Sequence, residues 1–174
     1  MHADQVDVPA EVVAALVAGQ FPRWRGLPVR PLRSAGTVNA LFRVGSDVVL
    51  RFPLRPSTGT ELRDELRQEQ EYARLLAAYL PVAVPEPLGL GAPGDGYPGW
   101  WTAYRFIPGE TAQPDRIDDL GVFAGDLAAV VVALHDIDTG GRSWSGFGRG
   151  GPLADQDADV RAALARHTLR AVLD

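Results

Sequence analysis

The order of apolar segments along the chain predicts an α+β fold. Segments with the pattern of β-strands occur only in the first 107 residues, accompanied by one short and one long helical pattern. The rest of the chain contains helical patterns alone. Strands and helices that are segregated along a sequence are typical of an antiparallel sheet with helices at its side or end. The change from sheet to helices is expected near Pro108 and Gly109.

A short helix and three strands are expected in the first third of the chain. Residues 9–20 have an amphipathic pattern, with Pro9 in the first turn and Gly19 near the end. Three stretches then have β character, at residues 29–33, 40–44 and 48–52. Residues 45–47 (GSD) separate the last two and predict a hairpin turn.

A long helix is expected over residues 60–79. Thr58 or Thr60 is suited to cap it, and the acidic residues of its first turn favour the positive end of the helix dipole. Apolar residues then recur every three or four positions, at Leu62, Leu66, Tyr72, Ala73, Leu76 and Leu80. Glu69 falls within this stripe, so its side chain is expected to face inward.

Two more strands and then only helices are expected in the second half. The proline-rich residues 81–87 end the long helix. Strands are predicted at residues 88–90 and 101–107, on either side of a loop rich in glycine and proline. Helical patterns follow at residues 115–137 and 155–173, and a glycine-rich loop separates them.

The composition is that of an ordinary globular protein, and a cytoplasmic location is expected. Of the 174 residues, 46% are hydrophobic and 22% are charged. No apolar run approaches the ~18 residues that span a membrane, and residues 1–9 lack the basic region of a signal peptide. The absence of cysteine excludes disulfides and thiolate metal sites. No basic stripe indicates nucleic-acid binding, so neither a membrane nor a nucleic acid is an expected partner.

The charged residues are unusual in kind and in distribution. All 17 basic residues are arginine, as expected of a GC-rich genome, so any phosphate contact must come from arginine or from backbone amides. Residues 1–90 carry ten acids and ten arginines, whereas residues 91–174 carry twelve acids and seven arginines. The second half is suited to a cationic partner, although a solvated acidic surface explains the imbalance more simply.

Three features, in sequence order, are candidates for a nucleotide site. Ser34, Gly36 and Asn39 lie in a loop between two strands, where small residues let backbone amides approach a polyphosphate, although a plain β-turn has the same composition. Arg51 in the following strand could grip phosphates as a bidentate donor, or be an ordinary exposed arginine. An inward-facing Glu69 needs a partner, and Arg51 is the obvious one. The ordered set is more specific than any single feature.

Two further motifs do not support a site. Residues 89–94 match G-x-G-x-x-G, but the glycines and prolines that follow prevent the helix that a dinucleotide site requires. His135, Asp136 and Asp138 suggest a catalytic loop, yet no asparagine lies five residues after either aspartate to bind Mg²⁺. His135 suits the C-terminal end of a helix. The three histidines have no metal-ligand spacing, so no metal site built by this chain is expected.

Together these segments resemble the aminoglycoside phosphotransferase family, which includes macrolide phosphotransferases. The segments that carry the resemblance are GTVNALFRV at 36–44, VVLRFP at 48–53, Glu69, LPVAVPEP at 80–87, YPGWW at 97–101, YRFIPGE at 104–110, Leu134-His135 and RGGPL at 149–153. The resemblance implies a truncated protein-kinase-like fold. Its N-lobe, an antiparallel sheet with a long helix, would cover residues 1–104, its hinge residues 105–110, and the first helices of its α-helical C-lobe residues 111–174.

The resemblance also implies roles for the candidate residues. Arg51 and Glu69 would hold the phosphates of ATP or GTP, and backbone groups of Arg105, Phe106 and Ile107 would meet the adenine. The activity implied is ATP-dependent phosphoryl transfer, with Mg²⁺, to a hydroxyl of a small molecule. That substrate would be an aminoglycoside or macrolide antibiotic, giving resistance, or a metabolite.

The family's catalytic segment is missing from the sequence. No His-Gly-Asp followed by an asparagine and a second aspartate is present. The catalytic residues and metal ligands are therefore expected outside this chain, which alone is expected to be inactive. The alternatives are a non-catalytic nucleotide-binding remnant and an interaction module. Val130, Val131, Val132 and Leu134 are expected to leave an apolar surface exposed, which would promote aggregation.

Overall fold

A computed structural model describes residues 5–33, 36–142 and 151–166 of the chain. The chain divides into two structural units, residues 1–137 and residues 138–174, which are described separately below. Within the described ranges, no helix combines the length and the apolar character that crossing a membrane requires.

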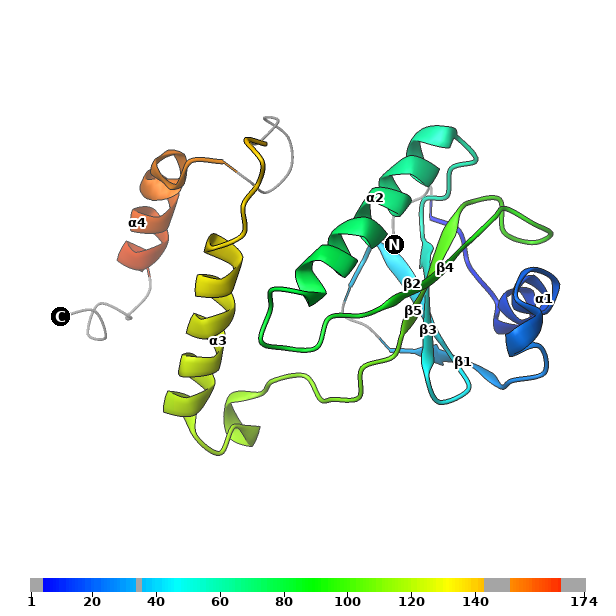
Figure 1. The fold of residues 1–174 in the computed structure, drawn as a ribbon, viewed down its shortest axis with the longest axis horizontal. Coiled ribbons are helices and arrows are strands. Elements are labelled where there is room, and N and C mark those ends of the chain that lie inside the picture. Colours follow the sequence, from blue (N-terminus) through cyan, green and yellow to red (C-terminus); the bar gives the residue numbers. More distant parts are fainter. Residues whose placement is uncertain (1–4, 34–35, 143–150, 167–174) are drawn as a thin grey trace. The chain divides into compact units, whose positions relative to one another are not determined.

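A five-stranded antiparallel sheet forms the centre of the first unit (Figure 1). Its strands are β1 (Val29–Leu32), β2 (Asn39–Val44), β3 (Val48–Pro53), β4 (Pro87–Gly91) and β5 (Trp101–Arg105). They lie side by side in the order β1-β2-β3-β5-β4, so β4 is an edge strand. Gly45 has a φ of 59° in the turn between β2 and β3, a conformation that glycine adopts without steric cost. The sequence predicts this turn.

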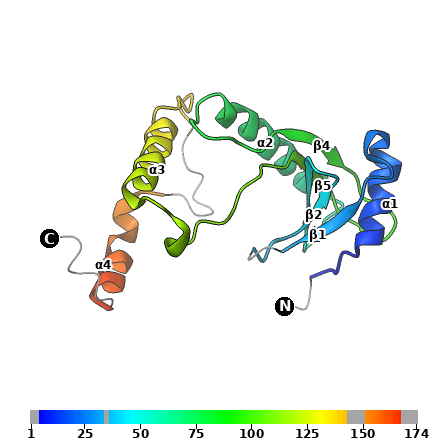
Figure 2. The same cartoon turned by 90° about the horizontal axis from the view of Figure 1, so that it is seen from below.

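The hydrophobic core lies on one face of the sheet. Because alternate residues of a strand point to opposite faces, one set of side chains packs together there: Phe42, Val44, Val48, Leu50, Phe52, Trp101 and Ala103. Helix α1 (Ala10–Gln20) covers this face with Val13, Leu16 and Val17. Figures 1 and 2 show that α1 and α2 (Thr60–Ala77) lie on opposite sides of the sheet.

Aromatic rings fill the centre of the core. The ring of Phe52 stacks on that of Trp101, with 4.9 Å between their centroids, and meets Phe42 and Tyr97 edge-on. Tyr97 is only 1% exposed, and its hydroxyl donates a hydrogen bond to the carbonyl oxygen of Pro53 at 2.8 Å. This bond satisfies the polar end of a buried ring and ties the loop before β5 to the end of β3.

Helix α2 is held on the other face by few buried side chains. Only Leu66 and Gln70 are buried, at 9% and 5% exposure. The helix starts after Gly59, and no side chain caps it, so neither Thr58 nor Thr60 has the predicted capping role. Instead, the hydroxyl of Ser57 accepts a hydrogen bond from the Gly59 amide at 3.1 Å.

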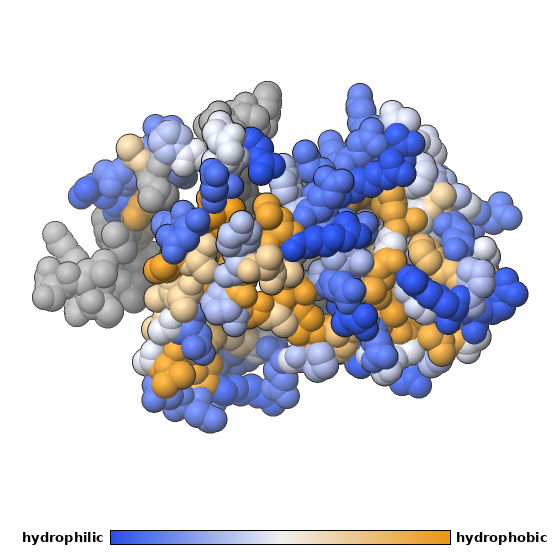
Figure 3. Space-filling model, in the orientation of Figure 1, coloured by the Kyte–Doolittle hydropathy of each residue, from blue (hydrophilic) through white to orange (hydrophobic). Residues whose placement is uncertain are grey.

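Helix α3 (Leu120–His135) has no buried residue. Asp119 caps it by accepting hydrogen bonds from the amides of Gly121 and Val122, at 2.8 and 3.0 Å. The predicted helix at 115–137 therefore starts later than expected, because this cap follows a separate 3₁₀ turn, η2 (Pro114–Arg116). Figure 3 shows apolar surface over α3, where the exposed side chains are Leu120, Val122, Leu127, Val131, Val132 and Leu134.

The ends of several elements differ from the sequence prediction. Strand β5 ends at Arg105, two residues early, because Phe106 turns to donate its amide to the Asp47 carbonyl. In the second unit, a 3₁₀ turn, η3 (Leu153–Gln156), precedes helix α4 (Asp157–Arg166). Residues 167–173 of the predicted last helix lie outside the described residues. The prediction that no helix begins among the glycines from 89 onward is confirmed, because β4 and a loop occupy this stretch.

Candidate functional site

The face of the sheet beneath α2 carries the candidate site, and we call it the Arg51 face. Strand alternation and pairing place its members together: Asn39, Leu41, Arg43, Val49, Arg51, Pro53, Thr102 and Tyr104. Arg51 lies opposite Leu41 on one neighbouring strand and opposite Thr102 on the other. It is therefore the central cation of a face whose reverse side is the hydrophobic core.

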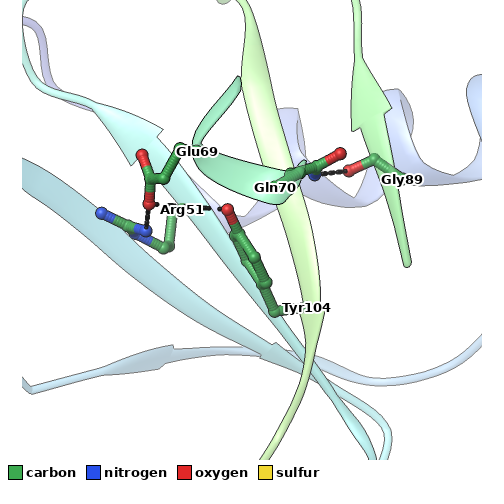
Figure 4. A network of polar contacts seen from close by, with 5 residues as sticks. All are labelled: Arg51, Glu69, Gln70, Gly89 and Tyr104. Atoms are coloured by element: carbon green, nitrogen blue, oxygen red, sulfur yellow. Dashed lines mark hydrogen bonds and ion pairs between the residues drawn. The ribbon is translucent and has the colours of Figure 1, made fainter. Parts of the chain in front are cut away.

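Arg51 and Glu69 form an ion pair between β3 and α2 (Figure 4). The Nη1 group of Arg51 donates a hydrogen bond to Oε1 of Glu69. The side chains are 36% and 44% exposed, so both remain accessible to a ligand. An arginine has five N–H donors in a planar fork, and this pair orients the fork while engaging only part of it. The structure thus confirms the predicted inward direction of Glu69 and its predicted partner.

Tyr104 completes the polar group on this face. Its ring lies beside Arg51, with 5.7 Å between the guanidinium carbon and the ring centroid, and its hydroxyl lies 3.5 Å from Oε1 of Glu69 (Figure 4). Burial raises the pKa of Tyr104, the Glu69 carboxylate raises it further, and Arg51 opposes both effects. The phenol therefore stays protonated at neutral pH and can donate to Glu69.

Two cavities open on the Arg51 face, and the ion pair borders both. The first, of about 470 Å³, is the more polar of the two and includes Thr37, Asn39, Arg55 and Leu62 in its lining. The second, of about 650 Å³, is mainly apolar, and the side chains that make it so include Leu41, Val49, Tyr72, Leu76, Val84 and Tyr104. Arg51, Glu65 and Glu69 line both cavities. Each volume is in the range of small-ligand sites, ~300–1,000 Å³.

The loop between β1 and β2 forms one wall of the polar cavity. Its residues Thr37 and Val38 line the cavity together with Asn39, which the structure places at the start of β2. Gly36 is exposed, and Ser34 lies outside the described residues. Hydrogen bonds from two other segments of the chain hold the loop in place. The Gln5 side chain donates a hydrogen bond to the Thr37 carbonyl at 3.2 Å, and the Leu54 amide donates to the Val38 carbonyl at 2.8 Å.

The three residues predicted to meet a base lie directly after β5. The Arg105 amide donates to the Glu86 carbonyl at 2.8 Å, and the Phe106 amide donates to the Asp47 carbonyl at 2.7 Å. The Arg105 side chain pairs with Glu86 at 2.6 Å. These amides are therefore used within the protein. A base contact would have to use the carbonyl oxygens of this segment or the amide of Ile107, a residue that is 37% exposed.

The sequence prediction missed several residues that line these cavities. Thr102 and Tyr104 stand next to Arg51 and Val49 across the β3–β5 pairing, which the sequence does not reveal. Leu41 could have been found, because it lies two residues after Asn39 on the same face of a predicted strand. Within the described part of the chain, no three histidines, aspartates or glutamates gather as a protein-built metal site would require.

Comparison with known proteins identifies a family and a fold. The pattern that defines the phosphotransferase enzyme family (APH) matches residues 29–174 of the chain. A search among curated proteins finds no match to the sequence.

Solved structures that resemble the chain are aminoglycoside phosphotransferases. The GDP complex of wild-type aminoglycoside 2'-phosphotransferase-IIIa has a TM-score of 0.64 and 22% identity, over 96% of this chain and 55% of that chain. The GDP and kanamycin complex of APH(2")-IIIa has a TM-score of 0.62 and 22% identity, over 93% and 53%. The streptomycin-ATP-APH(2")-IIa ternary complex has a TM-score of 0.51 and 20% identity, over 76% and 42%.

These similarities confirm the predicted α+β, kinase-like fold. The chain spans about half the length of the first two solved structures, at 53% and 55%.

Proposed function

The chain belongs to the phosphotransferase enzyme family, and on this premise we propose that its Arg51 face binds the nucleotide of a small-molecule phosphotransferase. The observation that carries the proposal is the position of the Arg51–Glu69 pair. It lies where the more polar cavity and the apolar cavity meet on one face of the sheet. A nucleoside triphosphate has the same division, with a polyanion at one end and a flat base with apolar faces at the other.

In this proposal, each cavity takes one end of the nucleotide. The base of ATP or GTP would lie in the apolar cavity against Leu41, Val49 and Tyr104. The phosphates would extend past Arg51 into the polar cavity, beside Asn39. Kinase-like enzymes hold phosphates with a strand cation that pairs with a helix glutamate, and an arginine fork suits phosphate oxygens.

The remaining proposed binding residues come from the two loops that flank the face. Small residues at Ser34 and Gly36 would let backbone amides approach the phosphates. Backbone groups of the segment from Arg105 to Ile107 would meet the edge of the base. The proposal keeps the lobes expected from the sequence, with the N-lobe at residues 1–104, the hinge at 105–110 and the partial C-lobe at 111–174.

The bound nucleotide would supply a γ-phosphoryl group for transfer to a hydroxyl of a small molecule. Arg51 would orient the triphosphate and offset its negative charge, and Glu69 would hold Arg51 in place. The sequence has no His-Gly-Asp segment followed by an asparagine. We therefore expect the general base and metal ligands outside these 174 residues, and no transfer by this chain alone.

The substrate class we propose is a small polyhydroxylated molecule, with a cationic aminoglycoside favoured. Two of the similar structures are described as complexes with kanamycin and streptomycin. The excess of acids in residues 91–174, twelve against seven arginines, supports a cationic partner. Modification of such an antibiotic would confer resistance.

Calorimetric titration of the chain with ATP and with GTP tests this proposal. We expect saturable binding of at least one nucleotide, with competition by inorganic tripolyphosphate for the phosphate end. Tight nucleotide binding without transfer to any hydroxyl, even with the missing segment supplied, would favour a non-catalytic remnant. No binding of either nucleotide or of tripolyphosphate would refute the proposal and favour an interaction module.

A further inference from the structure

Helix α2 carries Glu69 but has little apolar attachment to the sheet. Leu66 is its one buried apolar side chain, and Gln70 is its one buried polar side chain. Two of its larger apolar residues, Tyr72 and Leu75, are 39% and 36% exposed. A helix with so little buried apolar surface depends on specific polar contacts for its placement, because apolar packing alone is non-directional.

Gln70 supplies such a contact. Its Nε2 group donates a hydrogen bond to the Gly89 carbonyl of β4 at 2.8 Å (Figure 4). Gln70 is 5% exposed, and leaving a buried amide unpaired would be costly, so this bond selects one position of the helix. The acceptor strand lies at the sheet edge, where its pairing with β5 shifts register between Pro87 and Gly89.

Glu69 and Gln70 are adjacent on α2 and reach different strands. Glu69 contacts Arg51 on β3, while Gln70 contacts Gly89 on β4. These two bonds, on different sides of β5, fix the rotation of α2 about its axis, because adjacent residues of a helix differ in direction by about 100°. Without the second bond, a small rotation of α2 would move the Glu69 carboxylate away from the guanidinium.

We propose that Gln70 is a positioning residue, whose bond to β4 sets the rotation of α2 and thereby holds Glu69 against Arg51. The consequence for ligand binding rests on the proposed function, since it requires that Arg51 contact the phosphates. The consequence for the ion pair itself does not, so it can be measured without any ligand.

The chain offers a matched control in Gln20. Its side chain also ties a helix to the β4 region, donating to the Ala92 carbonyl at 2.9 Å and accepting from the Ala92 amide at 2.7 Å. It belongs to α1, on the opposite side of the sheet from Arg51. Gln70→Met and Gln20→Met each replace an amide by an apolar side chain of similar length. A general loss of stability should therefore affect Gln20→Met at least as much.

Side-chain NMR of ¹⁵N-arginine provides the ligand-free test. We expect Gln70→Met to move the guanidinium resonances of Arg51 toward their positions in Glu69→Ala, whereas Gln20→Met leaves them at the wild-type positions. Should Gln70→Met not fold, Gln70→Asn asks the same question, because its amide is one methylene too short to reach β4. Wild-type resonances for Arg51 in a folded Gln70 variant would overturn the proposal.

Nucleotide affinity provides the second test. Gln70→Met should weaken ATP binding by about three- to tenfold and leave adenosine binding unchanged, and the loss should vanish in a Glu69→Ala background. Equal loss of ATP and adenosine affinity, or a loss that persists without Glu69, would contradict a positioning role. If the wild-type chain binds no nucleotide, the proposed function fails, while the NMR comparison still decides the role of Gln70.

Discussion

Replacing Arg51 by alanine should separate ligand binding from folding stability. The Arg51–Glu69 pair is partly open to solvent, with side chains 36% and 44% exposed. Ion pairs of this kind contribute only ~0–1 kcal/mol, because water and salt screen them. After the substitution, water solvates the Glu69 carboxylate, which also keeps the Tyr104 hydroxyl 3.5 Å away. We therefore expect the free energy of unfolding to fall by less than about 1 kcal/mol.

The same substitution should cost far more in nucleotide binding. A hydrogen bond between charged groups contributes ~1.5–3 kcal/mol, which corresponds to an affinity change of about 10- to 100-fold. We expect Arg51→Ala to weaken ATP binding by this factor. Arg51→Lys should fall in between, because an ammonium keeps the charge but lacks the planar fork. Adenosine has no phosphates, so its affinity should be unchanged.

Calorimetry with ATP and adenosine, together with urea unfolding followed by tryptophan fluorescence, measures both quantities. Arg63→Ala is the matched control, because Arg63 also pairs with a carboxylate, that of Asp64 at 3.0 Å, and is absent from the lining of both cavities. The reasoning would be refuted if Arg51→Ala weakened ATP and adenosine equally, or if it lowered the unfolding free energy by several kcal/mol.

Tyrosine ionisation, core packing and the surface of α3 provide three further tests. Burial raises the pKa of Tyr97 and Tyr104, so the free energy of unfolding should be unaffected by these groups below pH ~10 and should fall above it, because the unfolded chain releases their protons first. Ultraviolet titration of the two Tyr→Phe variants checks that these phenols ionise at a higher pH in the folded chain than in the unfolded chain. A methyl group on Gly91 would overlap the Trp101 ring, so Gly91→Ala should cost ~1–3 kcal/mol in urea unfolding. Val131→Gln, at a side chain 50% exposed, should reduce binding of an apolar dye and elution as aggregates in size-exclusion chromatography, while unfolding changes by less than ~0.5 kcal/mol.

The sequence was sufficient to predict those features that depend on a local pattern of residues. Strands β2 and β3 could be predicted because two short runs of β character flank a turn signal at residues 45–47. The pairing of Arg51 with Glu69 could be predicted because a carboxylate within the apolar stripe of a helix needs a partner, and Arg51 is the cation of a predicted apolar strand. The roles of these residues in binding remain predictions.

The parts that could not be predicted depend on contacts between distant segments. The position of β5 between β3 and β4 brings Tyr104 to Glu69, 35 residues apart in sequence, and no local pattern reports that pairing. Gln70 interrupts the apolar stripe as a polar residue, so its burial was not expected, although it lies one helical turn after Leu66. Backbone groups of Arg105 and Phe106 were expected to meet the base, but the amides of both residues donate hydrogen bonds to the carbonyl oxygens of Glu86 and Asp47.

The most direct test of the central claim is an NMR titration of the ¹⁵N-labelled chain with ATP, followed through its backbone amides. The claim predicts that the resonances that move belong to the Arg51 face, in β2, β3 and β5, to the loop before Asn39 and to the segment after Arg105. Tripolyphosphate should reproduce only the changes near Asn39 and Arg51. Shifts confined to α1 and the core face, or scattered over the second unit, would contradict the account.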